Sequence, residues 1–233
     1  MGVLLTMNKF EKKWIVSLFS ITAIVLVLGF FVKLNFKDSG LSEIKKFKDL
    51  DTYDIRIENP LGLVNEELIY NQYANHQNEI IEILSNSSII AIVTPTGNLD
   101  IGEGSLGQEF IVNESIKGNV ANGEKGTFYL FSGFNVNERL KINYNEIVNL
   151  MNPQHKYLLF LEESQLNSYT KSRYFKSIVP PSYFCLSEST STLVSKNDKL
   201  LSSYKNSEFF VNSPRILTEL YKLKETVLNM YLN

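Results

Sequence analysis

The feature that most constrains this chain is a run of nineteen uncharged residues, WIVSLFSITAIVLVLGFFV, at positions 14–32. As a helix rising 1.5 Å per residue it would measure about 28 Å, close to the roughly 30 Å of a bilayer's hydrocarbon core. It lacks the polar face of a core helix. The residues that follow, Lys33 to Lys37, offer no small-x-small cleavage site, and no lipobox cysteine is present. We therefore predict an uncleaved transmembrane anchor over residues 14–32, with the lipid bilayer as its partner.

The charges around this anchor bear on its orientation. Residues 1–13 contain three lysines and one glutamate, a net charge of +2 that favours a cytoplasmic N-terminus. Five more lysines follow the anchor, so the lysine count alone does not favour that topology: Lys33, Lys37, Lys45, Lys46 and Lys48. The resemblance given below belongs to exported domains and favours a C-terminal part outside the cytoplasm. We expect a connector at residues 33–62 and an extracytoplasmic domain at residues 63–233.

Composition restricts what this domain can be. About 200 residues remain after the anchor, enough for one domain with a substantial core. The 15 Phe and 12 Tyr favour a globular domain over a disordered tail. The whole chain carries −2 and its first 13 residues +2, so the remainder carries −4 and has no electrostatic reason to bind nucleic acid. Cys185 is the only cysteine, which excludes an intramolecular disulfide.

The hydrophobic pattern predicts helices before and after a set of strands. Residues 63–85 suggest two helical pieces, and the spacing of apolar residues predicts a C-terminal helix at 214–232 with Ser213 as N-cap. Within the connector, residues 44–50 show a short helical stripe and residues 53–57 a short alternation. Strands are expected over these ranges: 89–93, 108–116, 127–131, 156–162, 173–179, 182–188 and 191–194. Pro95, Gly97 and Asn98 are expected to end the first strand.

Two short motifs within this order of segments carry a resemblance. One strand ends in Ile116-Lys117-Gly118, and a later strand contains Tyr157-Leu158-Leu159-Phe160-Leu161. Residues 78–194 resemble small exported bacterial β-barrel domains related to the OB-fold of netrin and tissue-inhibitor-of-metalloprotease modules, whose signatures are a V-L-K-G turn and a Y-L-L-F-L strand. The resemblance implies an α+β fold: a partly open OB-like antiparallel β-barrel with flanking helices, outside the cytoplasm.

The chain also departs from that family. The animal inhibitors act through an N-terminal Cys-x-Cys, which is absent here, so inhibition of a metalloprotease does not carry over. The bacterial domains often place a Gly just before the Y-L-L-F-L strand, where this chain has Pro153-Gln154-His155. The resemblance therefore implies a fold and a location more than an activity.

Polar motifs offer weak candidates for chemistry. Residues 102–107 spell G-x-G-x-x-G but lead into a strand, whereas a dinucleotide site needs this motif to open a helix. Asn98, Asp100 and Glu103 supply oxygen ligands in the same loop, without EF-hand spacing. His76, His155 and Cys185 lie in separate segments without ligand spacing, so a zinc site or a Cys–His pair would require the fold to bring them together. No cofactor, metal site or catalytic residue is assigned.

Aromatic residues give the one candidate for a ligand-facing surface. Tyr129, Phe131 and Phe134 follow one another along a strand and its turn, and a barrel face of this class can line a ligand groove with such side chains. Packing in the core is the alternative for all three.

These observations favour a non-catalytic module at the outer membrane face that binds a protein or a cell-envelope component. Two alternatives stay open. One is an envelope hydrolase whose site is assembled only by folding, and the other is a structural subunit of a membrane complex.

Overall fold

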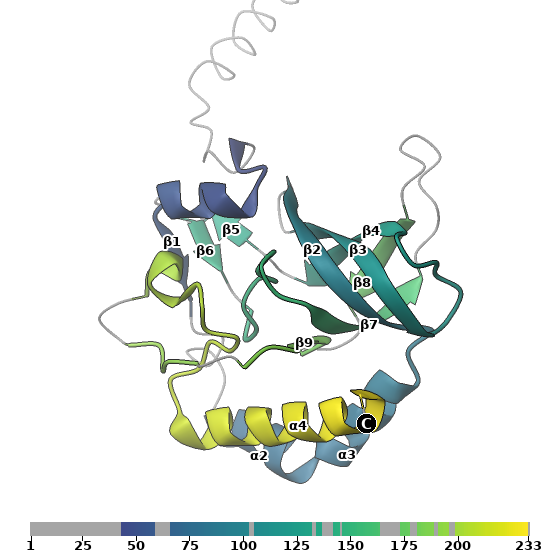
Figure 1. Cartoon of the computed structure of the whole chain (residues 1–233). Coiled ribbons are helices and arrows are strands. Elements are labelled where there is room, and N and C mark those ends of the chain that lie inside the picture. The colour runs from purple at the N-terminus through teal and green to yellow at the C-terminus, as the bar shows by residue number, and fades with distance from the viewer. Residues whose placement is uncertain are drawn as a thin grey trace, which may run out of the picture. The chain divides into compact units, whose positions relative to one another are not determined.

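Strands rich in β-branched and aromatic residues form the centre of the computed structural model (Figure 1). The structure describes residues 43–58, 66–102, 105–131, 134–136, 142–144, 146–163, 173–177, 181–188, 191–195 and 199–232. All of them belong to one unit, Ser39–Asn233. The predicted cytoplasmic segment 1–13 and anchor 14–32 lie outside these ranges. Within them, no helix is both long enough and apolar enough to cross a bilayer.

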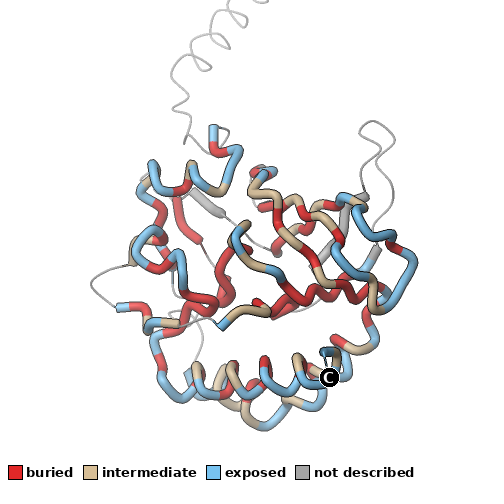
Figure 2. The backbone as a smooth tube through the Cα atoms, viewed as in Figure 1, coloured by how far each residue is buried: buried red, intermediate tan, exposed pale blue. Residues whose placement is uncertain are grey.

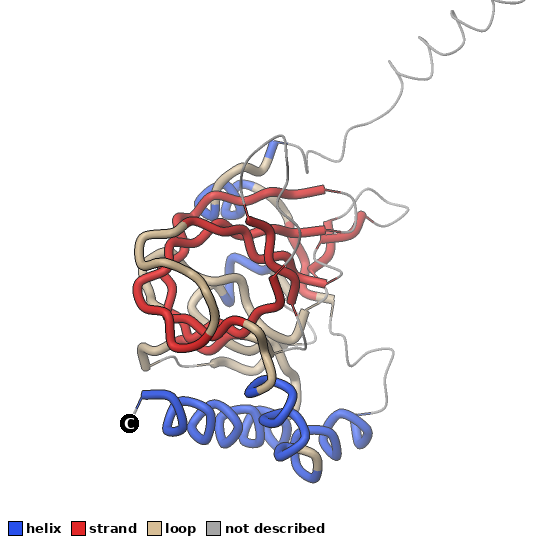
Figure 3. Tube along the Cα trace, turned by 90° about the vertical axis from the view of Figure 1, so that its right-hand side faces the viewer, coloured by secondary structure: helices blue, strands red, loops and turns tan. Residues whose placement is uncertain are grey.

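The larger sheet of the described part contains β2 (Ile89–Gly102), β3 (Ser105–Lys117), β4 (Lys125–Phe131), β8 (Arg173–Ser177), β7 (Tyr157–Glu163) and β9 (Tyr183–Cys185), in that order. The β4–β8 pair is parallel, and the other neighbours are antiparallel. β2 also pairs with β7, from Ile89 opposite Leu161 to Val93 opposite Tyr157. Five strands therefore pair in the cyclic order β2-β3-β4-β8-β7, and Figure 3 shows them curving round instead of lying flat.

β2 is longer than predicted. Pro95, Gly97 and Asn98 do not end it, because the register with β3 shifts between Pro95 and Leu99 and the strand then resumes. Gly97 has a φ of 84°, a backbone conformation that suits glycine and absorbs the shift. Asn98 donates its backbone N–H to Thr96 Oγ1 at 3.2 Å within this irregularity. The turn residues mark a bulge inside a strand, which sequence alone does not distinguish from a strand end.

A smaller sheet lies beside the larger one. β1 (Ile55–Ile57) runs parallel to β6 (Ile142–Tyr144), and β5 (Phe134–Val136) pairs antiparallel with β6. The 3-10 helix η3 (Phe47–Thr52) precedes β1. Ile44, Leu50, Ile55 and Ile57 are buried. Residues 44–57, which the sequence places in the connector, thus contribute both a strand and core side chains to the fold.

Helices α2 (Glu66–Asn75), α3 (Gln77–Ser85) and α4 (Pro214–Leu232) lie together along one side of the strands (Figures 1 and 3). The two-piece helix and the C-terminal helix predicted from the sequence are confirmed. Of the stripe predicted at Ile216, Leu220, Leu223, Val227 and Tyr231, the first four residues are buried and Tyr231 is half-buried. Figure 2 shows buried and exposed positions alternating along α4. At roughly 1.5–3 kcal/mol each, these four side chains contribute about 6–12 kcal/mol of hydrophobic stabilisation.

The remaining described segments lead along the chain from β9 to α4. The 3-10 helix η5 (Leu201–Tyr204) leads to residues 207–211, which are buried. Residues 191–194 do not form the predicted strand, although Val194 N donates to Val211 O at 2.9 Å. The rings of Phe160 and Tyr231 meet edge to face with centroids 5.5 Å apart, which joins β7 to α4. The fold class is α+β, as predicted.

Candidate functional site

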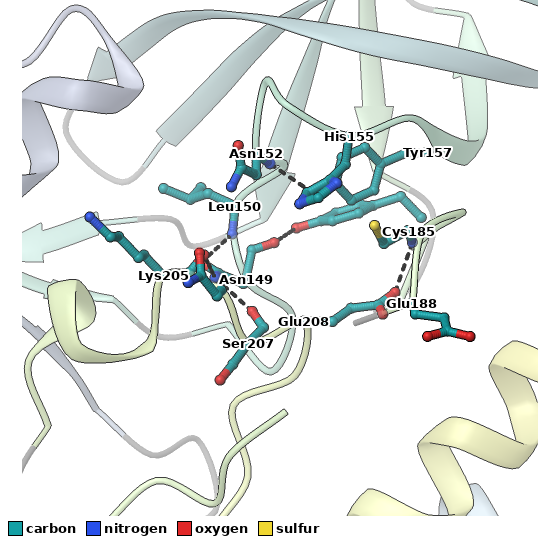
Figure 4. A pocket seen from close by; sticks show the side chains of 12 residues that line it. Asn149, Leu150, Asn152, His155, Tyr157, Cys185, Glu188, Lys205, Ser207 and Glu208 are labelled. Atoms are coloured by element: carbon teal, nitrogen blue, oxygen red, sulfur yellow. Dashed lines mark hydrogen bonds between the residues drawn. The ribbon is translucent and has the colours of Figure 1, made fainter. Parts of the chain in front are cut away.

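A polar cavity of about 140 Å³ lies where three separate segments meet, and Figure 4 shows the side chains that line it. The first segment is the loop 149–157, which runs into β7. The second is β9 with the residues up to 188, and the third is residues 205–208 after η5. We refer to this cavity as the 149–208 pocket.

Asn149 fixes two of these segments to each other. It is 5 % exposed, and its Nδ2 amide lies 3.2, 3.1 and 2.7 Å from the carbonyl oxygens of Tyr204, Lys205 and Ser207. Its Oδ1 accepts the Leu150 N–H at 2.8 Å. One buried side chain therefore replaces the hydrogen bonds that a regular strand pair would supply to these backbone groups.

Two further polar side chains hold the loop from the sheet side. Gln108 of β3 is 2 % exposed, donates Nε2–H to Met151 O at 3.2 Å and accepts Met151 N–H through Oε1 at 3.0 Å. Tyr183 of β9 donates its hydroxyl to Asn149 O. Because the hydrogen bonds of Gln108 and Tyr183 are buried, they hold the loop in a fixed shape, as a binding site requires.

Glu208, which lines the pocket, belongs to a buried ion pair. Lys224 of α4 contacts Glu208 Oε2 at 2.5 Å, and the two side chains are 10 % and 3 % exposed. Glu208 Oε1 also accepts the Cys185 N–H at 2.8 Å. The carboxylate thus has a charged partner and an amide partner, which offset the cost of burying it. This pair links α4 and β9 to the pocket wall.

In contrast to this framework, several polar groups that face the cavity have no partner among the described residues. The imidazole of His155, the Nδ2 amide of Asn152, the side chain of Asn206 and the carboxylate of Glu188 make no hydrogen bond there. Lys205 makes a single contact, to Asp51 Oδ2 at 3.4 Å. A rigid frame that presents solvent-accessible donors and acceptors without protein partners can bind a small polar group.

His155 and Cys185, which their spacing in the sequence did not connect, both line the 149–208 pocket. His76 lies outside the pocket. It is exposed between α2 and α3 and contacts Glu79 Oε1 at 2.9 Å. Burial raises the pKa of the Cys185 thiol, and the Glu208 carboxylate adds to that rise. The thiol is therefore protonated at neutral pH, which disfavours a nucleophilic cysteine.

The predicted oxygen ligands Asn98 and Asp100 are hydrogen-bonded to other side chains of the sheet. Asn98 donates Nδ2–H to Glu109 Oε1 at 3.0 Å, and Asp100 accepts the Tyr129 hydroxyl at 2.5 Å. Glu103 lies outside the described residues. In the part of the chain that the structure describes, no three His, Cys, Asp or Glu side chains gather as metal ligands. The G-x-G-x-x-G run at 102–107 connects β2 to β3 and opens no helix.

The predicted aromatic surface is described only in part. Tyr129 is a half-buried residue of β4 that hydrogen-bonds Asp100 across the sheet. Phe131 ends β4 and Phe134 begins β5, and their side chains lie outside the described part. A ligand groove at Tyr129, Phe131 and Phe134 stays a prediction.

Sequence reasoning missed the residues that build the pocket. Asn149, Gln108 and Glu208 are buried polar side chains with no motif spacing, and only their hydrogen bonds to backbone groups of other segments reveal them. No family model, no curated protein and no solved structure matches this chain.

Proposed function

We propose that the chain is a single-pass membrane protein whose OB-like domain lies on the extracytoplasmic side and binds a protein or cell-envelope component without catalysis. The observation that carries the binding role is the 149–208 pocket, where a hydrogen-bonded polar frame holds groups that have no partner among the described residues. The uncharged run at 14–32 supports the anchor. An anchored domain would meet its membrane neighbours at a raised effective concentration.

The cyclic strand pairing supports the OB-like part of the proposal. An OB-fold is a five-stranded, partly open Greek-key barrel. In this chain β2 pairs antiparallel with both β3 and β7, and β4 pairs parallel with β8. The β4–β8 and β7–β8 seams each join only a few residues, which suits a partly open barrel.

The binding role is tested by recovering partners from the protein's own membranes with tagged full-length protein. The pocket variant is His155→Ala with Glu188→Ala. A matched control is His76→Ala with Glu79→Ala, which removes the other histidine–glutamate set from an exposed helix junction. We expect wild type and control to recover the same component, and the pocket variant to recover at least about tenfold less, the effect of losing about 1.4 kcal/mol. Equal recovery by all three would refute a binding role for the pocket.

The location is tested separately by adding protease to intact cells. A C-terminal tag is expected to be cleaved while cytoplasmic proteins remain whole. Protection of the tag until the cells are lysed would place the domain inside and remove the extracytoplasmic part of the proposal.

An envelope hydrolase is the second candidate, because His155 and Cys185 line the same pocket. A hydrolase of this kind needs a thiolate, so Cys185 should react quickly with iodoacetamide at neutral pH. We expect slow alkylation, consistent with the raised pKa of the thiol. Rapid alkylation that His155→Ala abolishes would favour the hydrolase over the binding module.

A further inference from the structure

A groove of about 380 Å³ lies where α2 meets α3, and it shares no lining residue with the 149–208 pocket. Its apolar residues are Leu68 on α2 and Ile80 and Ile83 on α3. Leu68 is 63 % exposed and Ile83 is 43 % exposed, whereas Ile80 is buried. A partner that covered this groove would therefore remove two large aliphatic side chains from water. We refer to it as the α2–α3 groove.

The large hydrophobic side chains that the described part of the chain exposes all lie on its helical side. They belong to α2, α3 and α4 (Figure 1): Leu68, Ile83, Met230 and Leu232. The first two line the α2–α3 groove, and the last two, near the end of α4, do not. The pair on α4 is thus a matched comparison for the pair in the groove.

The two helices that form the groove are acidic, since together they contain four glutamates and neither lysine nor arginine. Glu67 is partly neutralised by the Arg215 guanidinium of α4 at 3.5 Å. Glu79 lines the groove, and its contact among the described residues is the exposed His76 imidazole at 2.9 Å. The Glu82 carboxylate, one turn further along α3, has no partner in that part of the chain. Negative charge therefore borders the apolar residues of the groove.

Charge complementarity decides which partner fits this groove. A basic amphipathic helix can place its apolar face against Leu68 and Ile83 and its lysines or arginines near the carboxylates. A second copy placed symmetrically would bring Glu79 and Glu82 against their own counterparts, which repel. An anionic lipid surface or a nucleic acid would be repelled as well. The basic helix is the occupant that satisfies both the apolar and the acidic residues.

We propose that the α2–α3 groove is a docking site for a basic amphipathic helix of a partner protein. Leu68 and Ile83 contact the apolar face of that helix, and Glu79 and Glu82 attract the cations beside it. This site goes beyond the binding role proposed above, because it is separate from the 149–208 pocket.

Fluorescence anisotropy on the full-length protein, held in nanodiscs of neutral phosphatidylcholine, tests the site with two labelled peptides. The first has about 14 residues, roughly 21 Å as a helix, with leucine at every third or fourth position and lysine elsewhere. The second has glutamate in place of each lysine. We expect the lysine peptide to bind above the level of empty nanodiscs, at least about tenfold more tightly than the glutamate peptide, and more weakly as salt rises. Equal binding of the two peptides, or no binding above empty nanodiscs, would overturn the proposal.

Substitutions of the exposed apolar residues assign the peptide to the groove. Leu68→Ser with Ile83→Ser should weaken the lysine peptide by about tenfold or more, because it removes apolar surface that the peptide covers. Met230→Ser with Leu232→Ser, at positions 53 % and 42 % exposed, is the matched control and should leave the affinity unchanged. Equal losses in the two double variants would contradict the assignment. Self-association of the full-length protein that the first variant abolishes would place a second copy in the groove and also overturn it.

The acidic residues are tested with the same peptide. Glu79→Gln with Glu82→Gln should weaken the lysine peptide by about three- to tenfold and reduce its dependence on salt. Glu114→Gln with Glu225→Gln removes two exposed carboxylates on other elements and is the control. An unchanged affinity in the first of these variants would show that the carboxylates do not attract the peptide, contrary to the proposal.

Exchanging variants between the two sites separates this inference from the binding role of the pocket. The pocket variant, His155→Ala with Glu188→Ala, should bind the lysine peptide as wild type does. The control variant of the pocket experiment, His76→Ala with Glu79→Ala, removes groove residues, so it should weaken the peptide and still recover the pocket's component. Loss of peptide binding in the pocket variant would place the peptide in the pocket and overturn the groove as its site.

Discussion

Asn149 shows how one side chain can organise a loop that has no regular secondary structure. Its amide serves three carbonyl oxygens and one N–H, and its own backbone N–H donates to Glu208 O at 2.8 Å. Residues that substitute for strand pairing in this way are hard to replace, because their removal leaves several buried backbone groups unsatisfied.

Replacing Asn149 with alanine is therefore expected to destabilise the protein by about 3 kcal/mol or more, since each unsatisfied buried group costs about 1–3 kcal/mol. Urea unfolding measures the change. Asn206→Ala, an exposed neighbour with no side-chain bond in the described structure, should stay within about 0.5 kcal/mol of wild type. Equal effects of the two changes would show that Asn149 does not hold the loop.

The Lys224–Glu208 pair allows a second test at the level of single residues. Lys224→Met leaves the Glu208 carboxylate buried without its cation, which should cost about 3–5 kcal/mol. Adding Glu208→Gln should restore most of that loss, because it removes the unpaired charge. A double-mutant cycle in urea gives the coupling. A double variant no more stable than Lys224→Met alone would contradict this account.

Among the elements, the Lys117-Gly118 turn joins α3, β2 and β3. Lys117 Nζ donates to Ser85 O at 2.9 Å. Ser85 is the last residue of α3, and the helix dipole favours a cation at this C-terminal end. Gly118 has a φ of 94°, and a Cβ built there would lie 2.5 Å from Ser88 O. The Lys-Gly pair thus meets a steric and an electrostatic need at once, which is a physical reason for its place at the end of β3.

Gly118 and Gly123 have similar φ angles but different surroundings, so substitutions at the two positions separate backbone strain from a steric clash. Gly123 has a φ of 84°, and a Cβ there would meet nothing within 4 Å. Gly123→Ala should cost about 1 kcal/mol from the left-handed backbone alone. Gly118→Ala adds a clash with the backbone and should cost at least about twice as much. Thermal unfolding of the two variants compares them, and equal losses would mean that the turn shifts to admit the methyl group.

The elements also show how far sequence reasoning reaches. The runs at 127–131 and 156–162 are apolar on both faces, and they correspond to β4 and β7. The alternating strand predicted at 53–57 corresponds to β1, which belongs to the domain and not to a connector, because Ile55 and Ile57 are buried in the core although charged residues surround them. The pocket could not be predicted at all: Tyr183 and Ser207 lie 34 and 58 positions from Asn149, and buried polar side chains carry no periodic signal.

Considered as a whole, the molecule buries several tyrosine hydroxyls. Burial raises the pKa of Tyr73, Tyr144, Tyr157 and Tyr183 above the usual 10.0. Below about pH 10 these phenols are protonated in both the folded and the unfolded chain. Above it the unfolded chain loses protons that the folded chain keeps, so the free energy of unfolding falls as pH rises.

Each such tyrosine should lower the free energy of unfolding by about 1.4 kcal/mol per pH unit above about pH 10. Urea unfolding between about pH 9 and pH 11 measures the slope. Tyr73→Phe removes one of these groups and should reduce the slope by that amount. Tyrosinate absorbance near pH 10 that Tyr73→Phe lowers by one phenol, while the circular dichroism stays unchanged, would show that Tyr73 ionises within the fold.

Helix α4 supplies Lys224 to Glu208, the Tyr231 ring to Phe160 and the Tyr231 hydroxyl to Ser85 Oγ. During translation these residues leave the ribosome after the described strands β1–β9 have emerged. Until then the nascent chain has an uncovered apolar sheet and a carboxylate without its cation. A message that ends before codon 214 would therefore yield a product that proteases remove, because the last helix completes the core.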